Sequence, residues 1–97
     1  MGYIITHWQY IVIGYFLTDK NKLCEGDTVE TLEACKGAVD MIKLNIPKAH
    51  FYKTESNGYY PKGCYLYVGD DVGSVFFNEH ETGSSHNYAR QICGHGE

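Results

Sequence analysis

The chain has 97 residues and a formal charge of −4, and 43% of its residues are hydrophobic and 21% charged. This length and composition predict one globular domain, residues 1–97, and exclude a disordered chain. Its 8 lysines and arginines are scattered rather than gathered in a basic stripe. Nucleic acid is therefore excluded as an expected partner.

The N-terminal stretch, residues 3–17, is rich in Ile, Val, Tyr, Phe and Trp, which favour β-strands. Gly14 predicts a bulge or bend within it. The apolar run of residues 10–17 is too short to cross a bilayer and lacks the features of a signal peptide. We therefore divide the chain into an N-terminal strand region, residues 1–17, and a cysteine-containing core, residues 18–97, and expect no transmembrane segment. An apolar strand at a sheet edge also predicts pairing with another chain or self-assembly.

Residues 31–44 carry the pattern of one helix. Apolar side chains recur there at steps of three and four positions: Leu32, Cys35, Ala38, Val39 and Ile42. Thr31 is the expected N-cap, and Asp27 with Glu30 offers an alternative capping box one turn earlier. Gly37, in the middle of the pattern, predicts a close approach of the helix to the sheet.

The second half of the chain has the character of β-structure. Three short strands are predicted, at residues 49–53, 64–68 and 74–77. Residues 69–73 have the composition of a hairpin loop. Residues 78–97 are polar, and we interpret them as a tail that Cys93 ties down. The elements together predict an α+β fold in which one helix, residues 31–44, packs on a small antiparallel sheet.

The chain has 4 cysteines, Cys24, Cys35, Cys64 and Cys93, and none forms a Cys-x-x-Cys pair. An even number of separated cysteines in a small domain predicts two disulfides and an extracellular, secreted protein. Cys35 lies on the apolar face of the predicted helix and Cys64 begins a strand, which favours the pairs Cys35–Cys64 and Cys24–Cys93. Two alternatives stay open: four free thiols in a cytosolic protein, and a mixed Cys/His zinc site.

Four segments carry a resemblance to a known kind of module. They are Thr-Leu-Glu-Ala-Cys-Lys-Gly-Ala at 31–38, Tyr-Pro-Lys-Gly-Cys-Tyr at 60–65, Val-Phe-Phe-Asn-Glu-His at 75–80 and Gln-Ile-Cys at 91–93. In this order they resemble a small cysteine-containing module that recurs in predicted proteins of marine algae and other protists, over residues 15–94. That resemblance implies secretion and disulfides, and it implies no activity. A more distant likeness to PAN/apple modules, on the helix and the Cys-Tyr-Leu strand, implies protein or glycan binding.

Tyrosine is unusually common, with 9 residues against 4 phenylalanines. The core of so small a domain cannot hide them all, and exposed Tyr and Trp suit protein interfaces and stacking on sugar rings. The residues predicted to form such a binding surface are Tyr59, Tyr60, Tyr65, Tyr67 and Trp8. The alternative is a tyrosine-rich core with hydrated hydroxyl groups.

The C-terminal region contains His80, His86 and His95 beside several glutamates, and these side chains could ligate Zn²⁺ or Cu²⁺. A solvated polar tail is the alternative. Asp70 and Asp71 are interpreted as turn formers, because two adjacent carboxylates supply too few oxygens for Ca²⁺.

No arrangement of residues predicts catalysis. If all four cysteines pair, no thiol is left as a nucleophile, and nothing orients Ser84, Ser85 and His86 as a triad. We therefore expect no enzyme and no cofactor. The sequence predicts a secreted structural or interaction module that binds protein or glycan through a tyrosine-rich surface, with metal binding by the C-terminal histidines as the alternative.

Overall fold

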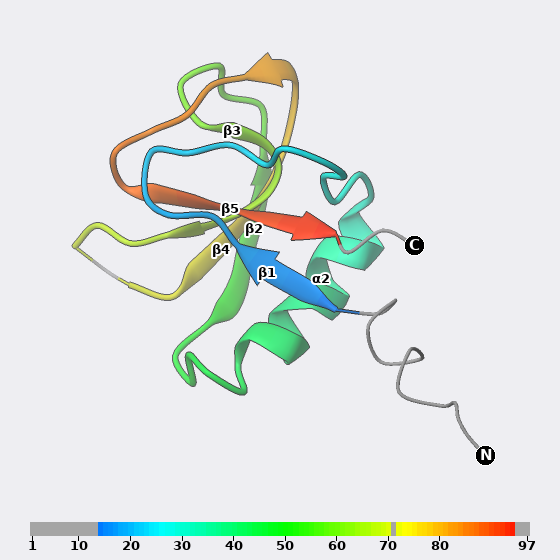
Figure 1. The fold of residues 1–97 in the computed structure, drawn as a ribbon, viewed down its shortest axis with the longest axis vertical. Helices are drawn as coiled ribbons and strands as arrows, with labels where there is room; N and C mark the ends of the chain where they lie inside the picture. Colours follow the sequence, from blue (N-terminus) through cyan, green and yellow to red (C-terminus); the bar gives the residue numbers. More distant parts are fainter. Residues whose placement is uncertain (1–13, 71, 95–97) are drawn as a thin grey trace.

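The computed structural model describes residues 14–70 and 72–94 (Figure 1). In chain order its elements are β1 (Tyr15–Leu17), α2 (Leu32–Ile42), β2 (His50–Glu55), β3 (Pro61–Tyr67), β4 (Ser74–Gly83) and β5 (Ala89–Gly94). The strands form one five-stranded sheet in the order β1-β5-β3-β4-β2, with α2 packed on one face. The predicted α+β class is confirmed. Of the strand region expected over residues 3–17, β1 is the described strand, and residues 3–13 lie outside the described residues, as do Asp71 and His95. Trp8 is among those residues.

Helix α2 agrees closely with its prediction. The Thr31 hydroxyl accepts a hydrogen bond from the Ala34 amide at 3.1 Å, which confirms the N-cap. The helix ends at Ile42, two residues before the expected end, and it buries Cys35, Ala38, Val39 and Ile42. The close approach expected at Gly37 is wrong, because Gly37 is exposed and a Cβ there would meet no atom within 4 Å.

The sheet departs from the expected antiparallel arrangement at one pair. Strands β1 and β5, β3 and β5, and β3 and β4 pair antiparallel, whereas β2 and β4 pair parallel. The cause is the position of β4, which inserts between β2 and β3. A short connection reverses the chain between β2 and β3, so a strand that is antiparallel to β3 is parallel to β2.

The polar tail expected over residues 78–97 is also wrong. Strand β4 continues to Gly83, and β5 lies inside the sheet between β1 and β3. The polar side chains of this region can be buried because their hydrogen bonds are satisfied. Gln91 is only 3% exposed, and its carboxamide accepts from the Cys24 amide at 2.6 Å and donates to the Lys62 carbonyl at 2.7 Å.

Both predicted disulfides are confirmed. Cys24 pairs with Cys93 and Cys35 with Cys64, with Cα–Cα separations of 5.7 and 5.4 Å. All four cysteines of the chain are paired, so the alternatives of free thiols and a Cys-ligated zinc site are excluded. The disulfide Cys35–Cys64 joins the helix to the sheet. Cys93 is buried but lies outside the core cluster under the helix, so the disulfide Cys24–Cys93 belongs to the other side.

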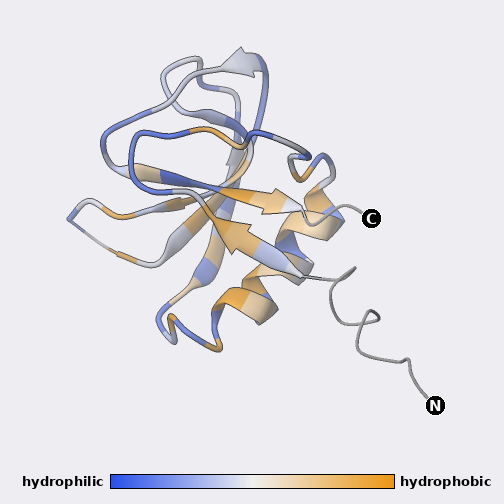
Figure 2. Ribbon diagram, viewed as in Figure 1, coloured by the Kyte–Doolittle hydropathy of each residue, from blue (hydrophilic) through white to orange (hydrophobic). Residues whose placement is uncertain are grey.

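The two faces of the sheet follow from the alternation of side chains along each strand. Leu66, Val75 and Ile92 belong to the cluster that packs against α2. Figure 2 shows hydrophobic colour on α2, on β1 and on the second half of β5, with hydrophilic loops between the elements. Within residues 14–70 and 72–94, no helix has the length and apolar character needed to cross a membrane.

Candidate functional site: an aromatic row on the open face of the sheet

The sheet face turned away from α2 carries aromatic side chains. Cys64, Leu66, Val75 and Phe77 belong to the core under the helix. Their neighbours Tyr65, Tyr67 and Phe76 therefore point to the opposite face. β2 adds Tyr52 to the same group, and the loops that flank β3 and β5 add Tyr60, His86 and Tyr88. We call these seven side chains the aromatic row: Tyr52, Phe76, Tyr65, Tyr60, His86, Tyr88 and Tyr67.

The middle of the row is a stack of parallel rings. The Phe76 and Tyr65 ring centroids are 5.2 Å apart with an interplanar angle of 11°. Tyr60 follows at 5.3 Å and 8° from Tyr65, and His86 stacks on Tyr60 at 4.1 Å and 20°. Offset stacking of this kind contributes about 0.5–1.5 kcal/mol per pair beyond the burial of area. The stack thus holds rings from β3, β4 and two loops in fixed relative positions.

The ends of the row are packed at steeper angles. Tyr52 meets Phe76 edge to face at 5.3 Å and 78°. At the other end Tyr88 lies 5.8 Å from His86 and 6.3 Å from Tyr67, tilted by 49° and 68°. Because edge-on packing leaves ring faces uncovered, the ends are the parts of the row that can contact another molecule.

The tyrosines predicted to form a binding surface differ widely in how exposed they are. Tyr59 is 79% exposed, as expected for a contact residue, and Tyr60 and Tyr67 are partly buried. Tyr65 is only 1% exposed. Its inclusion in an exposed surface was wrong, because Tyr60 and Phe76 cover the two sides of its ring.

Two exposed tyrosines were not among the predicted binding residues. Tyr52 and Tyr88 are 59% and 50% exposed. The alternation of β2 was a usable signal for Tyr52, because the strand was predicted and its polar neighbours mark it as an edge. Tyr88 had no such signal, because it precedes β5, which sequence reasoning interpreted as part of a tail.

Glu55, at the end of β2, supplies a carboxylate beneath the row. The Tyr65 hydroxyl donates a hydrogen bond to Glu55 Oε2. Burial of the ring, followed by this hydrogen bond and the negative charge, raises the pKa of Tyr65 far above its ordinary value. Burial, followed by the neighbouring Tyr67 and Glu55, also raises the pKa of Tyr60. Both hydroxyl groups are therefore neutral donors at physiological pH.

The buried carboxamide of Asn78 positions the turn that carries Tyr59 and Tyr60. Its Nδ2 lies 2.8, 3.1 and 3.0 Å from the carbonyl oxygens of Asn57, Tyr60 and Pro61. Its Oδ1 accepts from the Asn57 amide at 2.9 Å and the His80 amide at 3.1 Å. Asn78 is 1% exposed, so this one side chain fixes the turn to β4.

Two of the histidines predicted as metal ligands, His80 and His86, accept hydrogen bonds from nearby backbone amides. His80 Nδ1 accepts from the Thr82 and Gly83 amides at 3.2 and 2.9 Å, and His86 Nδ1 accepts from the Tyr88 amide at 3.0 Å. Among the residues that the structure describes, no group of three or more His, Cys, Asp or Glu side chains is placed to hold a metal ion. With His95 outside the described residues, metal binding stays an untested prediction.

Comparisons with known protein families, with curated proteins and with solved structures found no match. The resemblance to the algal and protist module therefore stays a prediction. A function for this chain has to be argued from the geometry of its own side chains.

Proposed function

We propose that the domain is a secreted, non-enzymatic interaction module that binds a protein or a glycan through the ends of the aromatic row and Tyr59. One observation carries this proposal: the row covers the sheet face that α2 leaves open, and its outer tyrosines Tyr52 and Tyr88 are 59% and 50% exposed. Tyr59, next to Tyr60 in the chain, is 79% exposed. Large exposed aromatic side chains on a small domain are typical of contact surfaces.

The arrangement lowers the conformational cost of binding. A tyrosine side chain has few rotatable bonds and so loses little conformational entropy on binding. Stacking already restricts the rings of Tyr65, Tyr60 and His86 before any partner binds. Only the outer tyrosines would still lose side-chain entropy. A preorganised surface of this kind binds more tightly than a flexible one of equal area.

The chemistry of the surface suits a polar partner with an apolar face. Tyrosine presents an apolar ring and a hydroxyl group that both donates and accepts, which matches a sugar ring as well as a peptide. Lys53 Nζ lies 5.6 Å from the centroid of the Tyr52 ring and adds a positive charge at that end. Tyr52 belongs to β2, which is an edge strand of the sheet. A strand of a protein partner, or of a second copy, that paired with β2 would therefore also contact the Tyr52 ring.

Two disulfides in 97 residues support the extracellular assignment. Disulfides persist in oxidising compartments and are rare in the cytosol, and small secreted domains use them to supplement a thin core. A partner outside the cell, whether a glycan or an extracellular protein, is consistent with this chemistry.

The proposal is tested by removing the exposed rings one at a time. Tyr59→Ala, Tyr52→Ala and Tyr88→Ala should each weaken binding to ligands found on glycan and extracellular-protein arrays, and at least one variant by about tenfold or more. Leu44→Ala is the matched control, because Leu44 is 77% exposed but follows α2 rather than lying on the aromatic face. Blank arrays together with a strict monomer by light scattering, or equal losses for the control, would overturn the proposal.

A further inference from the structure

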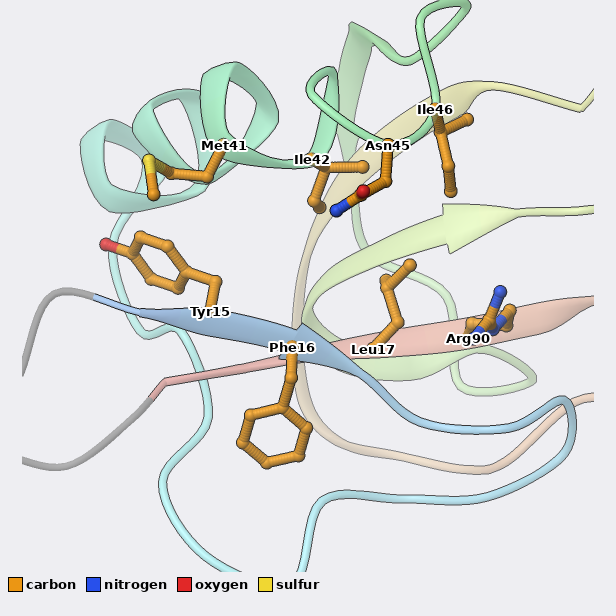
Figure 3. A pocket seen from close by; sticks show the side chains of 8 residues that line it. All are labelled: Tyr15, Phe16, Leu17, Met41, Ile42, Asn45, Ile46 and Arg90. Carbon is orange, nitrogen blue, oxygen red and sulfur yellow. The ribbon is translucent and has the colours of Figure 1, made fainter. Parts of the chain in front are cut away.

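A second surface lies between β1 and the C-terminal half of α2, away from the aromatic row. A groove of about 430 Å³ lies there. Figure 3 shows the side chains that line it, with β1 on one side and α2 on the other. Tyr15 and Leu17 line it from β1, and Met41, Ile42 and Ile46 line it from the helix side. A volume in this range is typical of small-molecule sites. Most of the residues that line the groove are thus apolar, while polar atoms contribute part of its surface.

The groove has polar groups as well. Asn45 and Arg90 both line it, and Arg90 lies at the side of Leu17 in Figure 3. Arg90 Nε donates to the Thr18 carbonyl at 2.7 Å. Within residues 14–70 and 72–94, the two terminal nitrogens of its guanidinium group have no protein partner. A guanidinium group with free N–H donors beside an apolar wall recognises carboxylates.

The charge next to the groove is mainly positive. Arg90 also lines a shallower hollow with Val68, Lys20 and Asp19. Lys22 pairs with Arg90 through the backbone, so a third cation belongs to the same neighbourhood. Asp19 and Glu25 line the hollow beside Lys22, so three cations against two carboxylates give this corner a small positive balance, although the whole chain carries −4.

We propose that this groove binds a free fatty acid, with the alkyl chain between β1 and α2 and the carboxylate at Arg90. The apolar walls suit the chain, and the local positive charge is complementary to the head group. The net charge of −4 opposes docking on an anionic bilayer, which favours the free acid over a lipid surface. This site is independent of the aromatic row and does not rest on the function proposed for it.

The groove also predicts a dependence on chain length. Each methylene group that leaves water contributes about a fourfold gain in affinity. Affinity should therefore rise from octanoate to decanoate and dodecanoate, and become constant once the chain exceeds the length of the groove. The chain length at which it becomes constant measures how much of the groove is used.

The experiment is a calorimetric titration of the full chain with these three acids below their micelle-forming concentrations. Decanol and decyltrimethylammonium test the head group. Met41→Gln should weaken decanoate binding on the order of fivefold by making one wall polar. Leu44→Gln is the matched control and should leave binding unchanged, because Leu44 is exposed and does not line the groove.

The head group is tested by Arg90→Gln, which should weaken decanoate on the order of fivefold and abolish its preference over decyltrimethylammonium. Arg90→Lys keeps the charge and should keep that preference, so a folding defect in the first variant can be recognised. Lys43→Gln removes a positive charge at the end of α2 from a residue that does not line the groove, and it should leave binding unchanged.

Three results would overturn the proposal. The first is binding that follows hydrophobicity alone, without preference for the carboxylate. The second is an equal loss in the two control variants. The third is no binding of any of the acids. This holds whether light scattering shows a dimer, in which a second copy covers the groove, or the chain binds only to lipid vesicles.

Discussion

The two faces of the sheet are filled by different chemistry. The face under α2 holds aliphatic side chains such as Leu66, Val75 and Ile92, and the disulfide Cys35–Cys64. The open face holds stacked aromatic rings, buried carboxamides and the disulfide Cys24–Cys93. A domain with a single described helix can cover only one face with it, so the other has to be closed by side chains. Polar groups serve that purpose only where each of them is hydrogen-bonded.

The largest predicted effect concerns the disulfides, one for each face. The chain-entropy argument gives a loss of roughly 3.5 kcal/mol for Cys35→Ala with Cys64→Ala, and roughly 4.5 kcal/mol for Cys24→Ala with Cys93→Ala. The second is larger because its cysteines are 69 rather than 29 positions apart. Urea unfolding at neutral pH measures both. A loss under about 1 kcal/mol for either pair would mean that its face is held by packing alone.

The next effect isolates the hydrogen bonds of the open face. Asn78→Ala should cost about 3 kcal/mol, because it leaves several buried donors and acceptors without partners. Asn57→Ala is the matched control. Asn57 is less buried, and its side chain accepts only from the Tyr59 amide at 2.9 Å among the described residues, so about 1 kcal/mol is expected. Equal losses in urea unfolding would contradict a special role for the buried carboxamide.

The third effect depends on pH. Tyr65→Phe removes the hydrogen bond to Glu55 and should cost about 1.5–3 kcal/mol at pH 7. The pKa of Tyr65 is raised in the folded protein, whereas an unfolded tyrosine titrates at about 10. The contribution of the hydroxyl group is therefore fully present below about pH 10 and is lost as the pH rises above it.

The measurement is the difference in unfolding free energy between wild type and Tyr65→Phe at pH 8 and at about pH 11. The difference should shrink at the higher pH. Tyr59→Phe is the control, since Tyr59 is 79% exposed and should show little difference at either pH. If the difference in unfolding free energy between wild type and Tyr65→Phe were the same at both pH values, ionisation of the Tyr65 hydroxyl group would not be linked to unfolding.

The smallest effect concerns the solvent side of α2. Gly37→Ala should stabilise the protein by about 0.5–1 kcal/mol, because alanine is the better helix former and the space is open. Gly63→Ala is the opposing control, because Gly63 has φ +83° and a Cβ there would lie 2.6 Å from the Val29 carbonyl oxygen. Thermal unfolding measures both. Destabilisation by Gly37→Ala would show that the helix lies closer to another element than the structure places it.

Much of the helix-covered face could be predicted from the sequence. The three- and four-residue spacing of the apolar side chains located α2, and the placement of Cys35 and Cys64 favoured the correct disulfide. The spacing along α2 is a local signal, and the disulfide depends on the single long-range pair Cys35–Cys64. They work because a helix that covers an aliphatic core must show its buried side chains at the helical period.

The open face was harder to predict, for a physical reason. Asn78 and Gln91 look like surface residues in a sequence, and only the three-dimensional pairing of their carboxamides explains their burial. The same is true of Tyr65, whose cover comes from Tyr60 and from Phe76 on another strand. The parallel pairing of β2 with β4 depends on where β4 inserts, which no local pattern encodes.

The internal position of β5 has a consequence for biosynthesis. A chain is synthesised from its N-terminus, so Cys35 and Cys64 are both available before β5 exists, and their disulfide can form early. The sheet, by contrast, cannot be completed until residues 89–94 have entered between β1 and β3. Cys93 lies in that segment, so the closure of the last disulfide coincides with the insertion of the last strand. Oxidation of Cys24–Cys93 would then mark the moment at which the domain becomes complete.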